Sequence, residues 1–109
     1  MPKFKEAVSH YDAIVASCQG IERKGKTVPY TSANGYMFSL VNKDGEIGMR
    51  FDKDRQAKLI EELNSSLFKS HGATMRGYVL IPEALWSDVD RCKALLQESY
   101  DHVMTLEPK

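Results

Sequence analysis

Apolar positions in the first part of the chain recur at the spacing of an amphipathic helix. Between about Pro2 and about Gln19, hydrophobic side chains follow at steps of three and four, which places them on one face of a 3.6-residue helix. They are Phe4, Ala7, Val8, Tyr11, Ile14, Val15 and Cys18. Pro2 suits the first turn, because its missing N–H removes no helical hydrogen bond. Gly20 provides a C-terminal stop, although Ile21 would also fit an apolar face extended by one turn.

The polar and apolar pattern then changes to that of strands separated by turn signals. The three expected strands are Val28–Thr31, Tyr36–Asn42 and Ile47–Phe51. Pro29 cannot donate to a ladder, so the first strand belongs at an edge or begins irregularly. Asn34-Gly35 and Asp44-Gly45 tolerate positive φ and are strong hairpin signals. We therefore predict a three-stranded antiparallel meander.

The next segment predicts a second helix and a fourth strand. Asp52 can cap the helix, whose apolar stripe consists of Ala57, Leu59, Ile60 and Leu63 and which ends at Asn64 to Ser66. We expect Leu67 and Phe68 to enter the core as a short irregular piece. Residues Thr74 to Ile81 predict the fourth strand, with Gly77 as a bulge.

A last helix is expected to open at Pro82 and Glu83 and to end near Leu106, before Pro108. Its wide apolar stripe contains Trp86, Leu95 and Tyr100, and part of it could remain for a second subunit. The element order is helix, three strands, helix, strand, helix. This order predicts an α+β fold, an antiparallel four-stranded sheet with helices packed on it, and residues 1–109 as a single domain.

Composition narrows the class of protein. Apolar residues make up 42%, enough for a core, and 15 basic residues balance 15 acidic ones. The resulting zero net charge argues against a dedicated duplex-DNA binder but leaves room for a local basic patch and for self-association. The amino terminus has no signal-peptide pattern, and no apolar run approaches the ~20 residues that span a bilayer. We expect a cytoplasmic protein without membrane contact.

Residues that carry chemistry do not form a recognisable constellation in this sequence. Cys18 and Cys92 lack CxxC spacing and are expected as buried thiols, although a disulfide between them is the open alternative. His10 and His102 are expected to be solvated or partly packed. The phosphate-binding and nucleophile motifs GxGxxG, GxxxxGK[ST] and GxSxG are absent. We therefore assign no catalytic, cofactor or metal-binding residue, and expect no cofactor.

Basic residues cluster weakly at two places. One cluster is Arg23, Lys24 and Lys26, which could join Arg50 or Arg76 in space; the other is Lys53, Arg55 and Lys58. A solvated loop is the ordinary interpretation of such a cluster. The alternative is a shallow patch for an anion or a nucleic acid, although the aromatic residues that would stack on bases are sparse here.

Several segments together resemble one known family. The segments PYTSANGYMFSLVNKDGEIGMRF, LFKSHGATMRGYVLIPEAL and SYDHVMTLEPK, in this order, are similar to the TfoX amino-terminal-domain family, and more closely to its small stand-alone bacterial members. The resemblance covers roughly residues 27–109. Against the family pattern, His71 replaces an aromatic, Gly77 replaces an acidic residue, and the tail is LEPK instead of LKPKP.

The resemblance implies a compact α+β domain, a link to regulators of natural competence, and no catalytic residues. We therefore expect a non-enzymatic regulatory or protein-binding module with a protein partner, or a second copy in a homodimer. The candidate contact surface consists of Tyr30, Thr31, Ser32, Asn34, Arg50 and Arg76. The alternative is a weak nucleic-acid-binding accessory protein that uses Arg23, Lys24 and Lys26. A small enzyme around His71 is a third hypothesis.

Overall fold

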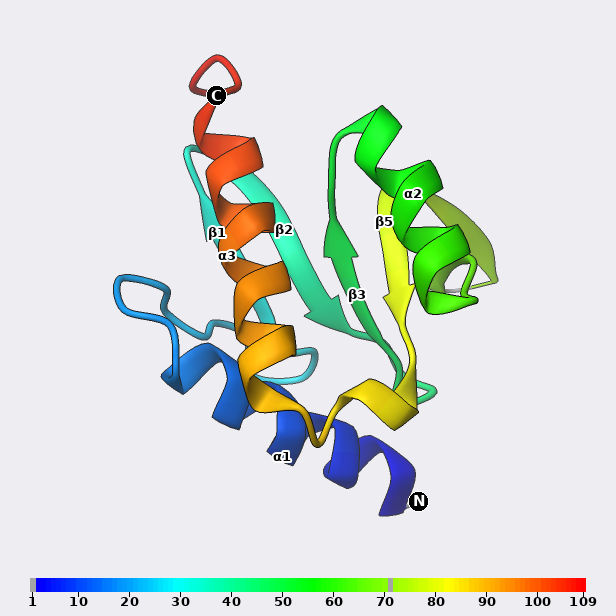
Figure 1. Cartoon of the computed structure of the whole chain (residues 1–109). Helices are drawn as coiled ribbons and strands as arrows, with labels where there is room; N and C mark the ends of the chain where they lie inside the picture. Colours follow the sequence, from blue (N-terminus) through cyan, green and yellow to red (C-terminus); the bar gives the residue numbers. More distant parts are fainter. Residues whose placement is uncertain (1, 71) are drawn as a thin grey trace.

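Three helices and a five-stranded antiparallel sheet form the fold of the computed structural model, which describes residues 2–70 and 72–109 (Figure 1). In chain order the elements are α1 (Pro2–Ala16), β1 (Tyr30–Ala33), β2 (Tyr36–Val41), β3 (Ile47–Arg50), α2 (Lys53–Leu63), β4 (Leu67–Ser70), β5 (Ala73–Ile81), a short 3₁₀ helix (Glu83–Leu85) and α3 (Val89–Met104). The strands lie in the order β1-β2-β3-β5-β4. The predicted α+β class and antiparallel sheet are thus confirmed.

The predicted number of strands is wrong, because Leu67–Ser70 forms a fifth strand instead of an irregular piece. This strand, β4, pairs with β5 through Leu67 opposite Val79 and Ser70 opposite Ala73. Only Phe68 of its four residues is buried, whereas Leu67 and Lys69 are exposed. A four-residue strand with one buried side chain has too short an alternation to be distinguished from a loop by its sequence pattern.

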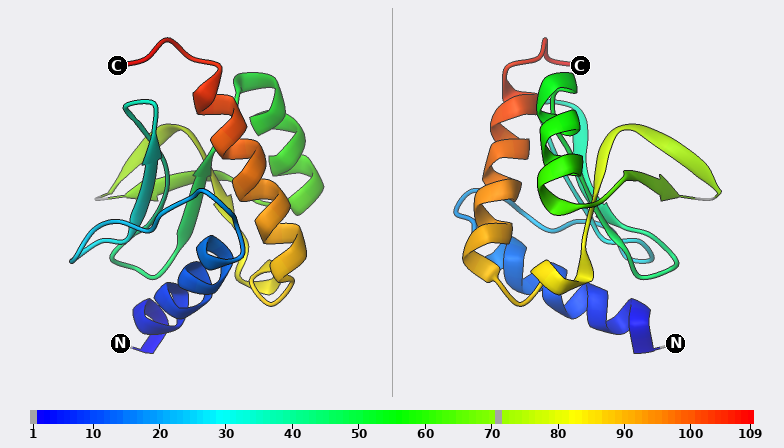
Figure 2. Two further views of the ribbon diagram at one scale, coloured as in Figure 1. Left: turned by 90° about the vertical axis from the view of Figure 1, so that its left-hand side faces the viewer. Right: turned by 45° about the vertical axis from the view of Figure 1, so that its right-hand side comes forward.

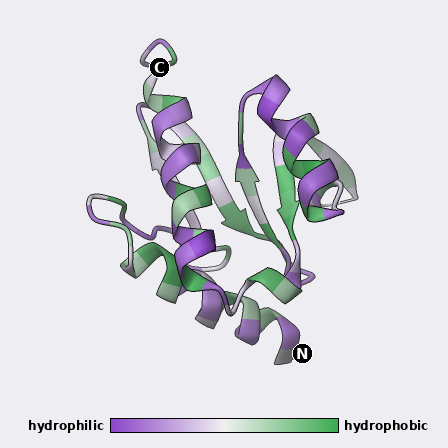
Figure 3. Cartoon of the chain, viewed as in Figure 1, coloured by the Kyte–Doolittle hydropathy of each residue, from purple (hydrophilic) through white to green (hydrophobic). Residues whose placement is uncertain are grey.

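α2 and α3 cover one face of the sheet, and α1 lies across one end of the sheet (Figures 1 and 2). α2 packs against β5, α3 lies over β2 and β3, and α1 contacts both α3 and β2. The central strands are mostly hydrophobic, whereas the helices alternate hydrophobic and hydrophilic residues around their axes (Figure 3). The main core lies between these layers, and its largest fully buried members are Tyr11, Ile14, Phe38, Val41, Ile47, Met49, Phe51, Leu59, Val79, Ile81 and Leu96.

The opposite face of the sheet carries a second, smaller apolar cluster. Its buried members are Leu40, Phe68 and Tyr78. The β4–β5 hairpin extends away from the helices on this side (Figure 2). Phe68 lies on Gly48 of β3 so closely that a Cβ at Gly48 would be 2.5 Å from its ring. The absence of a side chain at Gly48 therefore allows Phe68 to pack directly on the sheet.

Several element ends differ from the predicted ones. α1 ends at Ala16 instead of Gln19, and β1 begins at Tyr30 instead of Val28. The final helix begins at Val89, because Asp88 caps it by accepting a hydrogen bond from the N–H of Arg91 at 3.2 Å. Pro82 precedes only the short 3₁₀ helix. The local cap at Asp88 therefore prevails over the proline signal.

Other local predictions are confirmed. Asp52 caps α2 by accepting a hydrogen bond from the N–H of Arg55 at 3.0 Å, and Asn64 ends the helix with a φ of 51°. Gly77 has a φ of 90° and lies in the stretch where the pairing of β4 with β5 shifts register. Among the described residues, no helix combines the length and the apolar character needed to cross a bilayer.

Candidate functional site

Thr31, one of the candidate contact residues, lies inside the protein. Its side chain, Ser39 and Tyr11 are each 0% exposed. The Tyr11 hydroxyl and the Ser39 hydroxyl are 2.6 Å apart, and the Ser39 hydroxyl is also hydrogen-bonded to that of Thr31. Burial raises the pKa of Tyr11 to about 12. This chain of hydroxyl groups joins α1 to β1 and β2, so Thr31 has a structural role.

Asn34 connects the β1–β2 turn to the end of α3. The residue has a φ of 57°, and its side-chain amide donates hydrogen bonds to the carbonyls of Val103 at 2.9 Å and Leu106 at 2.8 Å. Its own carbonyl accepts from the N–H of Lys109 at 3.3 Å. The carbonyl of Leu106 lies just beyond α3 and receives its donor from Asn34, whereas the carbonyl of Val103 also accepts from the main-chain N–H of Leu106 at 3.2 Å. Both amide hydrogens of Asn34 are therefore used within the protein.

The C-terminal residues 105–109 lie against the same turn. The Tyr36 hydroxyl donates to the carbonyl of Glu107 at 2.7 Å. Gly35 has a φ of 85°, and a Cβ there would be 2.5 Å from the Cβ of Lys109. Gly35 is therefore required both by the turn and by the close approach of the tail.

Tyr30 and Ser32 lie at the outer edge of the sheet and are half-buried. Tyr30 exchanges two main-chain hydrogen bonds with Lys24, at 3.0 and 2.8 Å, and the Lys24 ammonium donates to the Ser32 hydroxyl at 3.0 Å. The segment around Lys24 thus covers the start of this edge. Tyr30 and Ser32 therefore lie next to Lys24.

Arg50 lies at the end of β3 in contact with an aromatic side chain. Its guanidinium carbon is 5.4 Å from the centroid of the Tyr36 ring, and the ammonium nitrogen of Lys109 is 5.0 Å from the same centroid. On another side, a Cβ at Gly77 would be 3.6 Å from Arg50 Cγ and 3.7 Å from Arg50 Nε. We call Tyr36, Arg50 and Lys109 the Tyr36 cluster.

His102, whose imidazole feels the charge of Arg50, is mainly neutral at pH 7. Burial lowers the pKa of His102, and the positive charge of Arg50 lowers it further, whereas Asp52 acts in the opposite direction. The positive charge of the cluster therefore comes from Arg50 and Lys109.

Other arginines are paired with carboxylates. Arg23 pairs with Asp12 at 3.1 Å, and Arg55 pairs with Glu98 at 2.7 Å. Arg91 pairs with Glu62 at 2.5 Å. Within residues 2–70 and 72–109, the ion pairs do not include Arg50, Arg76 or Lys109. Arg50 and Lys109 therefore place two positive charges at one end of the sheet. In the described part of the chain, neither has a carboxylate within ion-pair distance.

The six candidate residues are thus only partly brought together. Arg50 lies on the Tyr36 ring, and Asn34 is hydrogen-bonded to Lys109, the other cation over that ring. Exposed Arg76 precedes Gly77, on which Arg50 packs. The sequence analysis missed Tyr36 and Lys109. Tyr36 directly follows the Asn34-Gly35 turn, which is a usable signal, but only the folded chain brings Lys109 next to it. His71, the centre of the enzyme hypothesis, lies outside the described residues.

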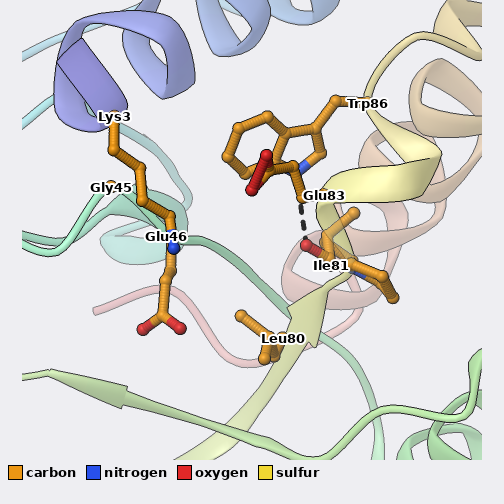
Figure 4. A pocket seen from close by; sticks show the side chains of 8 residues that line it. Lys3, Gly45, Glu46, Leu80, Ile81, Glu83 and Trp86 are labelled. Carbon is orange, nitrogen blue, oxygen red and sulfur yellow. Dashed lines mark hydrogen bonds between the residues drawn. The ribbon is translucent and has the colours of Figure 1, made fainter.

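A small hollow lies near the opposite end of the sheet (Figure 4). Lys3 and Glu46 line one side, and Glu83 and Trp86 line the other. The Trp86 indole N–H donates to the carbonyl of Ile81 at 3.2 Å. The volume of the hollow is about 70 Å³, well below the roughly 300–1,000 Å³ of ordinary ligand pockets. A space of this size does not enclose an organic substrate.

The predicted buried thiols are confirmed. Cys18 and Cys92 are buried and are not joined in a disulfide. Burial raises the pKa of both thiols, that of Cys92 to about 11, which makes them unreactive at neutral pH. In the described part of the chain, no group of three or more His, Cys, Asp or Glu side chains is placed to hold a metal ion.

Comparison with known proteins identifies one family. The model of the TfoX N-terminal domain matches residues 21–103. No curated protein matches the chain. The matched region begins after α1 and ends in the last turn of α3, so the residues that contact Thr31 and Asn34 from outside it belong to α1 and to the tail.

Proposed function

The chain belongs to the TfoX N-terminal domain family, and on this premise we propose that it is a non-enzymatic regulatory module that acts by binding another protein. The observation that carries the proposal is the Tyr36 cluster, where Arg50 and Lys109 lie over one aromatic ring without a carboxylate partner. Arginine and tyrosine are enriched among the residues that dominate binding energy at protein interfaces. The contact surface that we propose consists of Tyr36, Arg50, Arg76 and Lys109.

We favour a different protein over a second copy of this chain as the partner that binds the proposed contact surface. The apolar stripe of the last helix is used within the chain, since Trp86 and Leu95 are buried and Tyr100 packs edge-on against Phe38. Among the described residues, the large exposed hydrophobics are Leu67 and Met104. Light scattering in solution gives the oligomeric state, and a stable dimer at micromolar concentration would contradict this preference.

The test compares partner recovery by the wild type and by an altered surface. The chain is expressed with an amino-terminal affinity tag in its native host and is crosslinked to its partners in the cell. The partners that are recovered with it are quantified by mass spectrometry. We expect a partner enriched by the wild type to be lost with Tyr36→Leu/Arg50→Gln and retained with Lys5→Gln/Lys58→Gln. The second variant also removes positive charge but lies on exposed faces of α1 and α2.

Both variants must fold for this comparison, which circular dichroism and thermal unfolding establish. A partner that the folded Tyr36→Leu/Arg50→Gln variant recovers as well as the wild type would show that this surface is not the contact site.

Fewer observations support the alternative hypothesis, that the chain binds nucleic acid weakly. Of the residues named for it, Arg23 is paired with Asp12 and Lys24 donates to Ser32. Phosphate contacts release counterions, so an affinity that falls steeply with added salt is the signature to look for. Fluorescence anisotropy with a labelled single strand at increasing salt provides the measurement, and Arg23→Gln/Lys26→Gln should remove the binding if this alternative holds.

A further inference from the structure

Arg50 is held in place on two sides by its neighbours. The guanidinium lies over the Tyr36 ring at 5.4 Å, and the side chain also packs on the backbone at Gly77, where no side chain intervenes. The main chain of Arg50 is fixed as well, because its carbonyl accepts a hydrogen bond from the Ser99 hydroxyl at 2.6 Å. An arginine that is already ordered loses less conformational entropy when it binds.

The charges around Arg50 favour a carboxylate as its ligand. The guanidinium donates in a planar fork that matches both oxygens of a carboxylate, and Lys109 adds a second positive charge over the same ring. His102 adds little charge at pH 7, because burial and Arg50 lower its pKa. A site with these two cations can neutralise one or two negative charges.

A nucleic acid fits this surface less well than an acidic protein segment. The exposed Asp52 lies two residues after Arg50 in the chain, and the exposed Glu107 lies two residues before Lys109. A phosphate backbone carries a charge at every nucleotide and would run past these carboxylates, whereas a protein segment can place isolated carboxylates. We propose that the partner presents an acidic segment to the protein, with a glutamate or aspartate carboxylate bound by Arg50 next to Tyr36.

This inference rests on the proposed function and is tested with peptides of defined charge. The probe is a fluorescein-labelled peptide of alternating glutamate and serine, and its control has glutamine in place of every glutamate. We expect the glutamate peptide to bind and to shift the amide resonances of Tyr36, Arg50 and Gly77 in an ¹⁵N-labelled sample. The glutamine peptide should bind at least about tenfold more weakly, the size expected for loss of a charge-assisted hydrogen bond.

Gly77 offers a matched pair of variants. A Cβ at this position would lie 3.6 Å from Arg50 Cγ, so the carboxylate of Gly77→Asp would reach the guanidinium and compete with the peptide. Gly77→Asn has the same shape without the charge. Both residues tolerate the φ of 90° better than other side chains, and their strain is similar. We expect Gly77→Asp to weaken peptide binding about tenfold relative to Gly77→Asn.

The outcomes separate this inference from the proposed function. Equal binding of the glutamate and glutamine peptides, or equal binding by Gly77→Asp and Gly77→Asn, would overturn the acidic segment as ligand. Recovery of a cellular partner that still depends on Arg50 would then leave the protein-binding function standing. Displacement of the glutamate peptide by an equal concentration of a single-stranded oligonucleotide would also overturn the inference, in favour of nucleic acid.

Discussion

The side-chain amide of Asn34 donates a hydrogen bond to the carbonyl of Leu106 at 2.8 Å, across 72 positions of the chain. The same amide donates to the carbonyl of Val103 at 2.9 Å. A residue that looks like a simple turn former therefore also holds the end of α3. The polar segment before β2 has a structural role that its sequence pattern does not disclose.

Replacing Asn34 by glycine should destabilise the fold through these hydrogen bonds alone. Glycine accepts the φ of 57°, so the turn itself is not strained. The carbonyl of Leu106 loses its side-chain donor, and that of Val103 keeps only main-chain donors such as the N–H of Leu106 at 3.2 Å. We therefore expect the free energy of unfolding to fall by about 1–3 kcal/mol. Urea denaturation measures the change.

Asn64 provides the control for this experiment. It has a similar φ of 51° but is exposed at the end of α2, so Asn64→Gly should change the free energy of unfolding by less than about 0.5 kcal/mol. An equal effect of the two substitutions would mean that the hydrogen bonds of Asn34 contribute nothing measurable.

Stability should fall between pH 10 and pH 12 because of two buried tyrosines. Burial raises the pKa of Tyr11 and of Tyr78 from 10.0 to about 12. A raised pKa in the folded state means that the unfolded state releases its protons first, so stability is complete below pH 10 and is lost as the pH approaches 12. We expect a loss on the order of 2 kcal/mol for each tyrosine, measured by urea denaturation at increasing pH.

Tyr11→Phe separates the contribution of one of these groups. The variant should lose about 1 kcal/mol at pH 7, because the hydrogen bond to Ser39 is removed, and should show a shallower decline above pH 10. A decline as steep as that of the wild type would show that the pKa of Tyr11 is the same in the folded and the unfolded state.

Gly48→Ala should destabilise the sheet by overpacking. The new methyl group would lie 2.5–2.6 Å from ring carbons of Phe68, which is fully buried and has little freedom to move. We expect a loss of about 1–3 kcal/mol, measured by thermal unfolding. In the double variant with Phe68→Leu, the smaller side chain leaves room for the new methyl group. The double variant should therefore lose less stability than the sum of the losses of the two single variants.

A chain that begins at residue 21, where the family match begins, should fail to fold. α1 supplies Ala7, Tyr11 and Ile14, each 0% exposed, to the main core. Loss of three fully buried side chains exceeds the stability of an ordinary domain of this size. Far-UV circular dichroism and amide proton dispersion measure the result, and a cooperative unfolding transition in the truncated chain would contradict the expectation.

Elements with a long repeating pattern or a local cap were predictable from the sequence. The helix stripe of α1, the cap at Asp52 and the Asn34-Gly35 turn act within a few residues, and each is found where expected. The strand character of β4 was not predictable, because it depends on pairing with β5 and on the contact of Phe68 with Gly48, 20 residues away, neither of which the pattern of these four residues specifies.

The candidate site was less predictable than the fold. Whether Thr31 faces the core depends on the position of Tyr11, and whether Arg50 has a carboxylate partner depends on every neighbour in three dimensions. Lys109 reaches Tyr36 only because the end of α3 is fastened to the turn at Asn34. Such relationships are set by tertiary packing, not by local pattern.

The small apolar cluster behind the sheet has a dynamic consequence. Leu40, Phe68 and Tyr78 are separated by the sheet from the core beneath the helices, and Phe68 is the one buried side chain of β4. Withdrawal of that single ring releases β4 while the helical layer stays assembled. Amide protons of β4 should consequently exchange with deuterated solvent through a partial opening, well before those of β3 and α3.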